Sequence, residues 1–150
     1  MVCFVVNLAI LFLEVFLDNL IHAALSNCWS KLEIDKSFQT PSGKSEFRIL
    51  SIDIEKDEIK IEIGINRTNL TITKLALTKA LKYLIAHGHF DQNTHCEIRS
   101  NNEYDEAGPL CKYVRESNEP RTITYILPIL KFFGFVELAN VNGLNSTWLT

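Results

Sequence analysis

Apolar residues repeat at helical spacing near the end of the chain, and this pattern constrains the fold more than any other part of the sequence. The repeated positions are Ile123, Ile126, Leu127, Leu130 and Phe133. Residues three or four apart lie on the same side of a helix, so this set predicts a helix with one buried face. Gly134 follows directly and can adopt the left-handed conformation that ends a helix. Pro128 removes one backbone hydrogen bond, so the helix is expected to bend there or to form two shorter pieces.

A β-hairpin is expected after this helix. The apolar run that starts at Phe135 predicts a strand, and Asn142-Gly143 is a strong signal for a two-residue hairpin turn. Trp148 and Leu149 then belong to the returning strand. A further helix with Cys111 packed inside is expected to begin near Leu110, so the last third reads as helix, turn, helix and hairpin.

This order resembles the winged helix-turn-helix, a fold used mostly to bind duplex DNA. The resemblance covers roughly residues 70–150 and rests on pattern, because the fold has no invariant signature. It implies an α+β chain with three parts. These are an apolar N-terminal helix in residues 1–30, a loop and β-hairpin lead-in in residues 31–69, and the winged helix-turn-helix domain in residues 70–150.

The expected first helix of that domain follows Thr73. Its apolar positions are Leu75, Ala76, Ala80, Leu81, Leu84 and Ile85. Thr71 or Thr73 is expected to cap its start, and Gly88 follows its end. The preceding segment alternates in the manner of strands, with Ile59, Ile61, Ile63 and Ile65 on one face of the second strand. Arg48, Leu50, Ile52 and Ile54 are expected to share one face of the first strand, with residues 55–58 as the turn.

Val2 to Leu25 is the most hydrophobic part of the chain. Its polar residues Asn7, Glu14, Asp18 and His22 form one narrow stripe on a helix. No Lys or Arg precedes Lys31, which is unlike a secretory signal. The favoured interpretation is a helix packed on the domain or in a homodimer or larger protein complex. A membrane anchor and an upstream mistranslated start are the alternatives, and a charge near mid-bilayer costs about 2.5–3.5 kcal/mol.

The charge of the chain is uneven. Residues 67–91 hold four Lys/Arg against one Asp/Glu, whereas residues 92–150 hold five against seven. Neutralising phosphates supplies most non-specific DNA affinity, so the acidic balance of residues 92–150 argues against strong autonomous DNA binding. Four widely spaced cysteines, with no Cys-x-x-Cys pair, suit reduced thiols in the cytoplasm.

The expected DNA contacts lie on the two helices of the helix-turn-helix, away from the apolar stripe. They are Lys112, Arg115, Arg121, Thr122, Thr124, Tyr125 and Lys131. Arg121 and Tyr125 are expected in the major groove, and Lys112, Arg115 and Lys131 on phosphates. The favoured function is a DNA-binding module, either a small transcription regulator or the DNA-reading part of a restriction or mobile-element system, without a cofactor or metal.

Two other function classes stay open. A protein-interaction winged helix is suggested by the acidic balance and by Phe132, which is expected to be exposed. A metal-dependent nuclease would need Asp53, Glu58 and Lys60 around one cleft, since such enzymes hold magnesium with two acids. Gly43-Lys44-Ser45 ends like a phosphate-binding loop, but Phe38 stands where that motif needs glycine, so the match fails.

Overall fold

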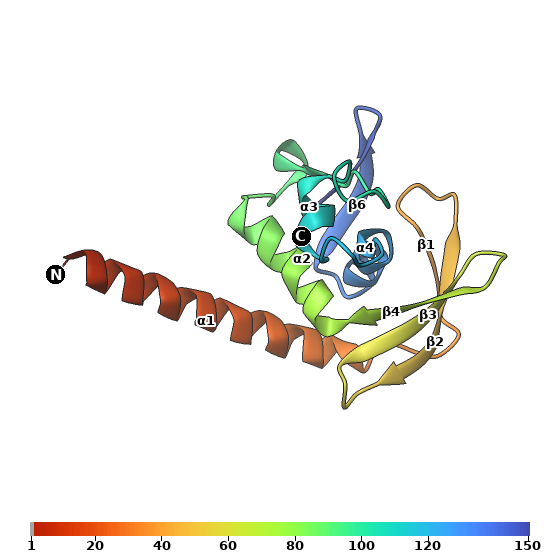
Figure 1. Cartoon of the computed structure of the whole chain (residues 1–150), viewed down its shortest axis with the longest axis horizontal. Coiled ribbons are helices and arrows are strands. Elements are labelled where there is room, and N and C mark those ends of the chain that lie inside the picture. The colour runs from red at the N-terminus through yellow and green to blue at the C-terminus, as the bar shows by residue number, and fades with distance from the viewer. Residues whose placement is uncertain (1) are drawn as a thin grey trace.

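The computed structural model describes residues 2–150, with side chains from residue 6 onward, and shows a mixed α+β chain (Figure 1). Helix α1 (Val2–Trp29) leads into an antiparallel sheet in the order β1-β2-β3-β4. Its strands are β1 (Ser37–Gln39), β2 (Glu46–Asp53), β3 (Glu58–Ile63) and β4 (Thr68–Thr73). The predicted hairpin is therefore the centre of a larger sheet.

The second half of the chain alternates short helices with a smaller antiparallel sheet. It contains α2 (Lys74–Ala86), the 3-10 turn η1 (Gln92–Thr94), β5 (Cys96–Glu97), α3 (Pro109–Tyr113), α4 (Ile123–Phe132), β6 (Val136–Val141) and β7 (Leu144–Leu149). The sheet order is β5-β7-β6, so the returning strand β7 lies in the middle.

Local signals placed the ends of these elements correctly. The Thr73 hydroxyl accepts a hydrogen bond from the Ala76 amide at 3.2 Å and caps α2. Gly134 follows α4 with φ +85°. Asn142 and Gly143 have φ values of +52° and +85° between β6 and β7, the left-handed pair that a tight hairpin turn requires.

One face of β2 was predicted wrongly. Phe47 and Ile49 are the buried residues of this strand, and Ile54 is 76% exposed. The register of β2 against β3 shifts between Ile49 and Ser51, so a bulge exchanges the two faces partway along the strand. Ile65 was also misplaced: β3 ends at Ile63, and Ile65 lies fully exposed in the next turn.

The predicted helical stripe near the C-terminus forms the centre of the core. Ile123, Ile126, Leu127, Leu130 and Phe133 are buried together with Leu81 and Leu84. Trp148, expected in the same core, is half-buried. Helix α4 runs as one helix through Pro128.

Helix α4 is covered on a second side that the sequence had predicted to be exposed. Tyr125 is only 8% exposed and packs edge-on against Phe47 of β2, with ring centroids 5.2 Å apart. Phe132, 38% exposed, meets Phe38 of β1 at 5.7 Å in the same geometry. The helix thus contacts β6 of the small sheet and β1 of the large one (Figure 1).

A buried lysine joins α1, α2 and the large sheet. Lys74, 6% exposed, is the first residue of α2 and forms an ion pair with Asp57 in the turn between β2 and β3. Its ammonium also donates to the Ser26 hydroxyl at 3.3 Å and lies 5.0 Å from the centre of the Trp29 ring. A cation in the first turn opposes the helix dipole, so the Asp57 carboxylate compensates an otherwise unfavourable position.

Only the C-terminal end of α1 packs on the rest of the chain. Ile21, Leu25 and Trp29 belong to the core, whereas the preceding half extends away from the molecule (Figure 1). The helix expected in residues 1–30 is confirmed. It is long and apolar enough to cross a membrane.

The core position of α4 predicts the effect of shortening one side chain. Leu127→Ala should lower the free energy of unfolding by about 2–5 kcal/mol, because the side chain is fully buried and leaves a cavity. Urea denaturation followed by circular dichroism measures the change. The control is Leu75→Ala on α2, where the leucine is 63% exposed and the change should stay below about 0.5 kcal/mol. Equal losses in the two variants would contradict the assigned core.

Candidate functional site

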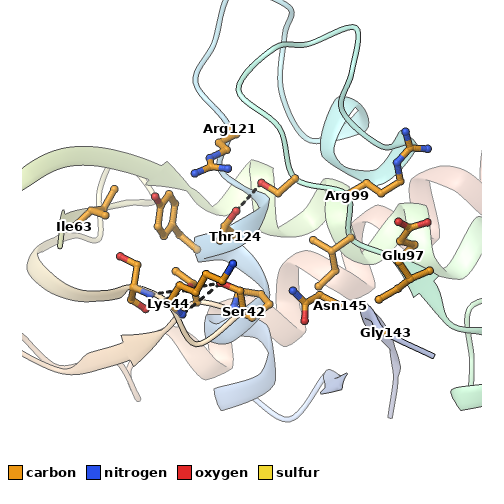
Figure 2. Close-up of a pocket in the computed structure, with 16 residues that line it drawn as sticks. Ser42, Lys44, Ile63, Glu97, Arg99, Arg121, Thr124, Gly143 and Asn145 are labelled. Carbon is orange, nitrogen blue, oxygen red and sulfur yellow. Dashed lines mark hydrogen bonds between the residues drawn. The ribbon is translucent and has the colours of Figure 1, made fainter. Parts of the chain in front are cut away.

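A cleft of about 640 Å³ lies where four segments meet at the N-terminal end of α4 (Figure 2). Its walls are the loop between β1 and β2, the chain that continues from β5, the first turn of α4 and the turn between β6 and β7. Polar side chains dominate the lining that these segments provide. The most relevant are Ser42, Lys44, Arg99, Ser100, Arg121, Thr124 and Asn145.

The loop that carries Lys44 is a closed turn. The Gly43 amide donates to the Thr40 carbonyl at 2.8 Å, and Gly43 has φ +68°. Pro41 occupies the second position of this turn, where its fixed φ is favourable. The buried Thr40 hydroxyl binds both the amide and the carbonyl of Ser45, at 3.3 and 3.1 Å, and fixes the loop to the sheet. The backbone of Lys44 is therefore held at the edge of the cleft.

The opposite wall is fixed by contacts with Gly108 and the small sheet. Arg99 has φ +36°, an uncommon value for a residue with a side chain. Its carbonyl accepts the Gly108 amide at 2.9 Å, and a side-chain carbon at Gly108 would lie 2.6 Å from the Arg99 Cβ, so only glycine fits. The Ile98 amide donates to the Asn145 carbonyl at 2.9 Å and ties this wall to the hairpin turn.

The first turn of α4 supplies the floor of the cleft. Arg121 precedes the helix, and the Thr124 hydroxyl shares a hydrogen bond of 2.7 Å with the Ser100 hydroxyl. Figure 2 shows Thr124 between Lys44 and Arg121, with the Arg99 guanidinium directed away from both. Thr122 makes no side-chain cap, so the positive end of the helix dipole faces the cleft without a side-chain acceptor from that residue.

The charges of the cleft are predominantly positive. Lys44, Arg99 and Arg121 line it together with one acid, Glu97. None of these three cations forms an ion pair with any residue between 6 and 150. The ion-paired cations of that region are Arg48, Lys56, Lys74, Lys79, Lys82 and Lys131. A chain with a formal net charge of −3 thus places the free cations of Lys44 and Arg121 at one concave surface, with the Arg99 guanidinium directed away from them, and this arrangement suits an anionic ligand.

The predicted contact residues do not share one face. Arg121, Thr124 and Tyr125 line the cleft, but the exposed position expected for Tyr125 is wrong because its ring packs on Phe47. Thr122 lies in a separate hollow next to Pro120, with its hydroxyl buried and without a partner in the described chain.

Arg115 is a structural residue, so its expected exposure on α3 is also wrong. It follows the end of α3, is 3% exposed, and donates to the carbonyls of Asn101 and Glu119 at 2.7 and 3.3 Å. Its guanidinium stacks near Tyr104, 5.5 Å from the ring centre. By holding the segment after Ser100 against the turn before α4, it positions the cleft without entering it.

The two remaining lysines lie outside the cleft. Lys112 donates to the Asp105 carbonyl at 3.0 Å and lies near the Tyr104 ring. Lys131 is at the far end of α4, where its ammonium is 3.4 Å from a Glu137 carboxylate oxygen.

Sequence reasoning missed Lys44 and Arg99. Lys44 had drawn attention only through the incomplete phosphate-loop match, and a loop between two strands cannot be assigned to a distant helix end from spacing alone. Arg99 stands in a polar stretch without any motif. The signal that identifies both is the unpaired charge, which appears only once the chain is folded.

The residues of the nuclease hypothesis do not surround a cleft. Asp53 and Glu58 face each other across the β2–β3 ladder, and the Asp53 carboxylate accepts the Lys56 amide at 3.0 Å. Lys60 is exposed on the outer face of β3. Within the described residues, no three His, Cys, Asp or Glu side chains are grouped as a metal site.

A buried thiol lies on β5 directly before the cleft wall. Burial, with a smaller contribution from the neighbouring Glu97 carboxylate, raises the pKa of the Cys96 thiol to about 11. Burial also raises the pKa of the Tyr83 hydroxyl. The Cys96 side chain is therefore neutral at physiological pH and acts as a small apolar group in the core.

Comparisons with protein-family models, with curated proteins and with solved structures find no match. The functional argument therefore depends on the geometry and charge of the cleft.

Alkaline pH should destabilise the protein partly through Cys96. Because the folded-state pKa is raised, the stabilisation is complete below the unfolded value of about 9 and is lost as the pH rises toward about 11. Two pKa units correspond to about 3 kcal/mol at most. Cys96→Ala should flatten the fall in unfolding free energy over this range, measured by urea denaturation at several pH values. Cys28→Ala, another buried free cysteine, is the control. A fall of the same size in Cys96→Ala and wild type would contradict the assignment.

Proposed function

We propose that residues 70–150 form a winged helix-turn-helix and that the chain is a DNA-binding module whose cleft contacts the phosphate backbone. The order α2-β5-α3-α4-β6-β7 supports the fold, because a winged helix places one strand after its first helix and a hairpin after its last. The sheet order β5-β7-β6 supports it as well, since the last strand pairs with both others.

The observation that carries the function is the group of unpaired cations at the α4 end. Lys44 and Arg121 lie on opposite sides of the Thr124 hydroxyl (Figure 2). Phosphate groups are bound by such a combination of cations, hydroxyl donors and a helix N-terminus. Neutralising phosphates releases counterions and supplies most sequence-independent affinity.

The covered face of α4 changes the expected mode of binding. Major-groove recognition needs an exposed helix face, but Tyr125 packs against β2 and Phe132 against β1. Arg121 is the one predicted groove-contacting residue that stays available, because it precedes the helix. We therefore expect mainly backbone contacts, with Asn145 at the start of β7 as a further donor and only weak preference for base sequence.

A protein-interaction module is the second candidate, and one observation favours it. Strands β1 and β2 already cover α4 with an apolar surface, as a bound partner would. Part of the Phe132 ring stays exposed, and the Lys36 ammonium lies 4.3 Å from the centre of this ring.

Single substitutions in the cleft test the DNA proposal. Lys44→Ala and Arg121→Ala should each weaken duplex binding about tenfold, or about 1.4 kcal/mol, through loss of a charged hydrogen bond. Each should also reduce the slope of log affinity against log salt by about one. Fluorescence anisotropy with a labelled duplex, measured on the full chain at several salt concentrations, gives both values.

Lys60→Ala is the matched control, since Lys60 is an exposed lysine on the outer face of β3, away from the cleft. Lys131→Ala should also have little effect. If both cleft variants bind as wild type does, the cleft is not the site. If the wild-type chain does not bind duplex DNA at low salt, the DNA proposal fails and protein interaction takes its place. Removing residues 1–30 is unsuitable here, because Leu25 and Trp29 are part of the core.

A further inference from the structure

We infer that the free half of α1 inserts into a lipid bilayer and anchors the globular part of the chain to a membrane surface. This inference is independent of DNA binding. It depends on the helix between Val6 and Leu17, where nearly every side chain is apolar and exposed.

Exposure is distributed around the whole circumference of this half of α1. Leu8 to Leu13 are six consecutive apolar residues, and all six are exposed. Since one helical turn takes about 3.6 residues, they cover every side of the helix. Phe12, Leu13 and Phe16 are each exposed by more than two thirds of their surface.

This distribution favours lipid over a second copy of the chain. A helical dimer buries one seam with a repeat of about 3.5 residues and leaves the other sides in water. Lipid tails surround a helix on all sides, and a helix that is apolar all round belongs inside a membrane or a large core. Within residues 6–150, no other segment covers this half of α1.

The polar residues of α1 mark the position along the helix beyond which it no longer packs on the globular part. The Lys82 ammonium of α2 forms an ion pair with Asp18 and lies 2.8 Å from its carboxylate oxygen. This ion pair, together with the nearby Glu14 charge, raises the pKa of Lys82. Glu14 lies about 6 Å along the helix from Asp18, so its carboxylate is close to this boundary and not at mid-bilayer. The membrane surface thus lies near Asp18.

The groove at this boundary contains side-chain types that are common where a protein contacts lipid headgroups. It lies between α1 and α2, and its lining includes Tyr113, Lys79 and the ion pair between Lys82 and Asp18. Tyrosine is enriched at the membrane–water interface, and lysine attracts the phosphates of anionic lipids. Tyr113 is 46% exposed, although it stands on a short helix that packs on the core.

The free part of the helix is long enough to reach most of the way through the hydrocarbon core of a bilayer. Val2 to Leu17 extend over about 24 Å at about 1.5 Å per residue, compared with about 30 Å for the hydrocarbon core of a bilayer. Leu25 and Trp29 are already packed against the protein, so the inserted part ends before them.

Vesicle flotation tests the inference. The full chain is synthesised in a cell-free system with phosphatidylcholine vesicles that contain some phosphatidylserine, and is then centrifuged through a density gradient. We expect wild type to float with the vesicles and to stay bound in high salt. The double variant Phe12→Lys/Phe16→Lys should stay at the bottom, with at least a tenfold lower floating fraction. Both side chains are exposed and lie outside the core, so the circular dichroism and thermal unfolding of the globular part should not change.

The matched control is Ile34→Lys/Ile65→Lys, which adds the same charge at two exposed isoleucines of the globular part, 61% and 100% exposed. It should float as wild type does. The inference is overturned if wild type stays at the bottom as a discrete dimer, which would assign α1 to a second copy. It is overturned equally if the Phe12/Phe16 variant floats as well as wild type.

Discussion

The ion pair between the buried Lys74 and the partly exposed Asp57 is the constraint on which the arrangement of the chain depends. Lys74 starts α2, Asp57 sits in the β2–β3 turn with φ +54°, and the Lys74 amide donates to the Asp57 carbonyl at 2.7 Å. The same ammonium reaches Ser26 and Trp29 at the end of α1. One side chain therefore fixes three elements relative to one another. A buried charge is tolerated only with such partners, and removal of one leaves the other unpaired in a region of low dielectric.

The sequence predicted those features that depend on neighbouring residues. The α4 stripe, the Thr73 cap, Gly134 and the Asn142-Gly143 turn are all set by side-chain spacing or by local backbone preference. Features that depend on segments far apart in the sequence could not be predicted from local patterns. The bulge after Ile49 exchanges the faces of β2, and three-residue β1 is too short to give a periodic signal. No local pattern predicts strand β4, because its outward residues are threonines and an asparagine.

For the candidate site, too, the sequence predicted what depends on neighbouring residues and missed what depends on distant ones. Arg121 and Thr124 were identified because they flank a helix start, and both line the cleft. The sequence could not show that the large sheet packs over the other predicted face of α4, because Phe38 and Phe47 are more than seventy residues away from their partners along the chain. A polar residue on the outer face of a helix gives the same local sequence pattern whether it supports the fold or contacts a ligand. Burial alone distinguishes Arg115, which supports the cleft wall, from Arg121, which is free to bind.

Whether one chain can bind DNA at the cleft and a membrane through α1 at the same time depends on where these two surfaces lie. In Figure 1 the hairpin turn and the β1–β2 loop lie on the side of the molecule away from the projecting end of α1. A bilayer around that end would leave the cleft in water. Separation also matters electrically, because anionic lipid headgroups repel a polyanion and the repulsion decays over a Debye length of about 8 Å at physiological salt. Cations on the membrane-facing side would be occupied by lipid phosphates. The unpaired Lys44 and Arg121 at the cleft thus lie apart from the α1 boundary, where Lys82 is paired with Asp18. The ion pair of Lys74 sets the relative orientation of these two regions by fixing α1 against α2.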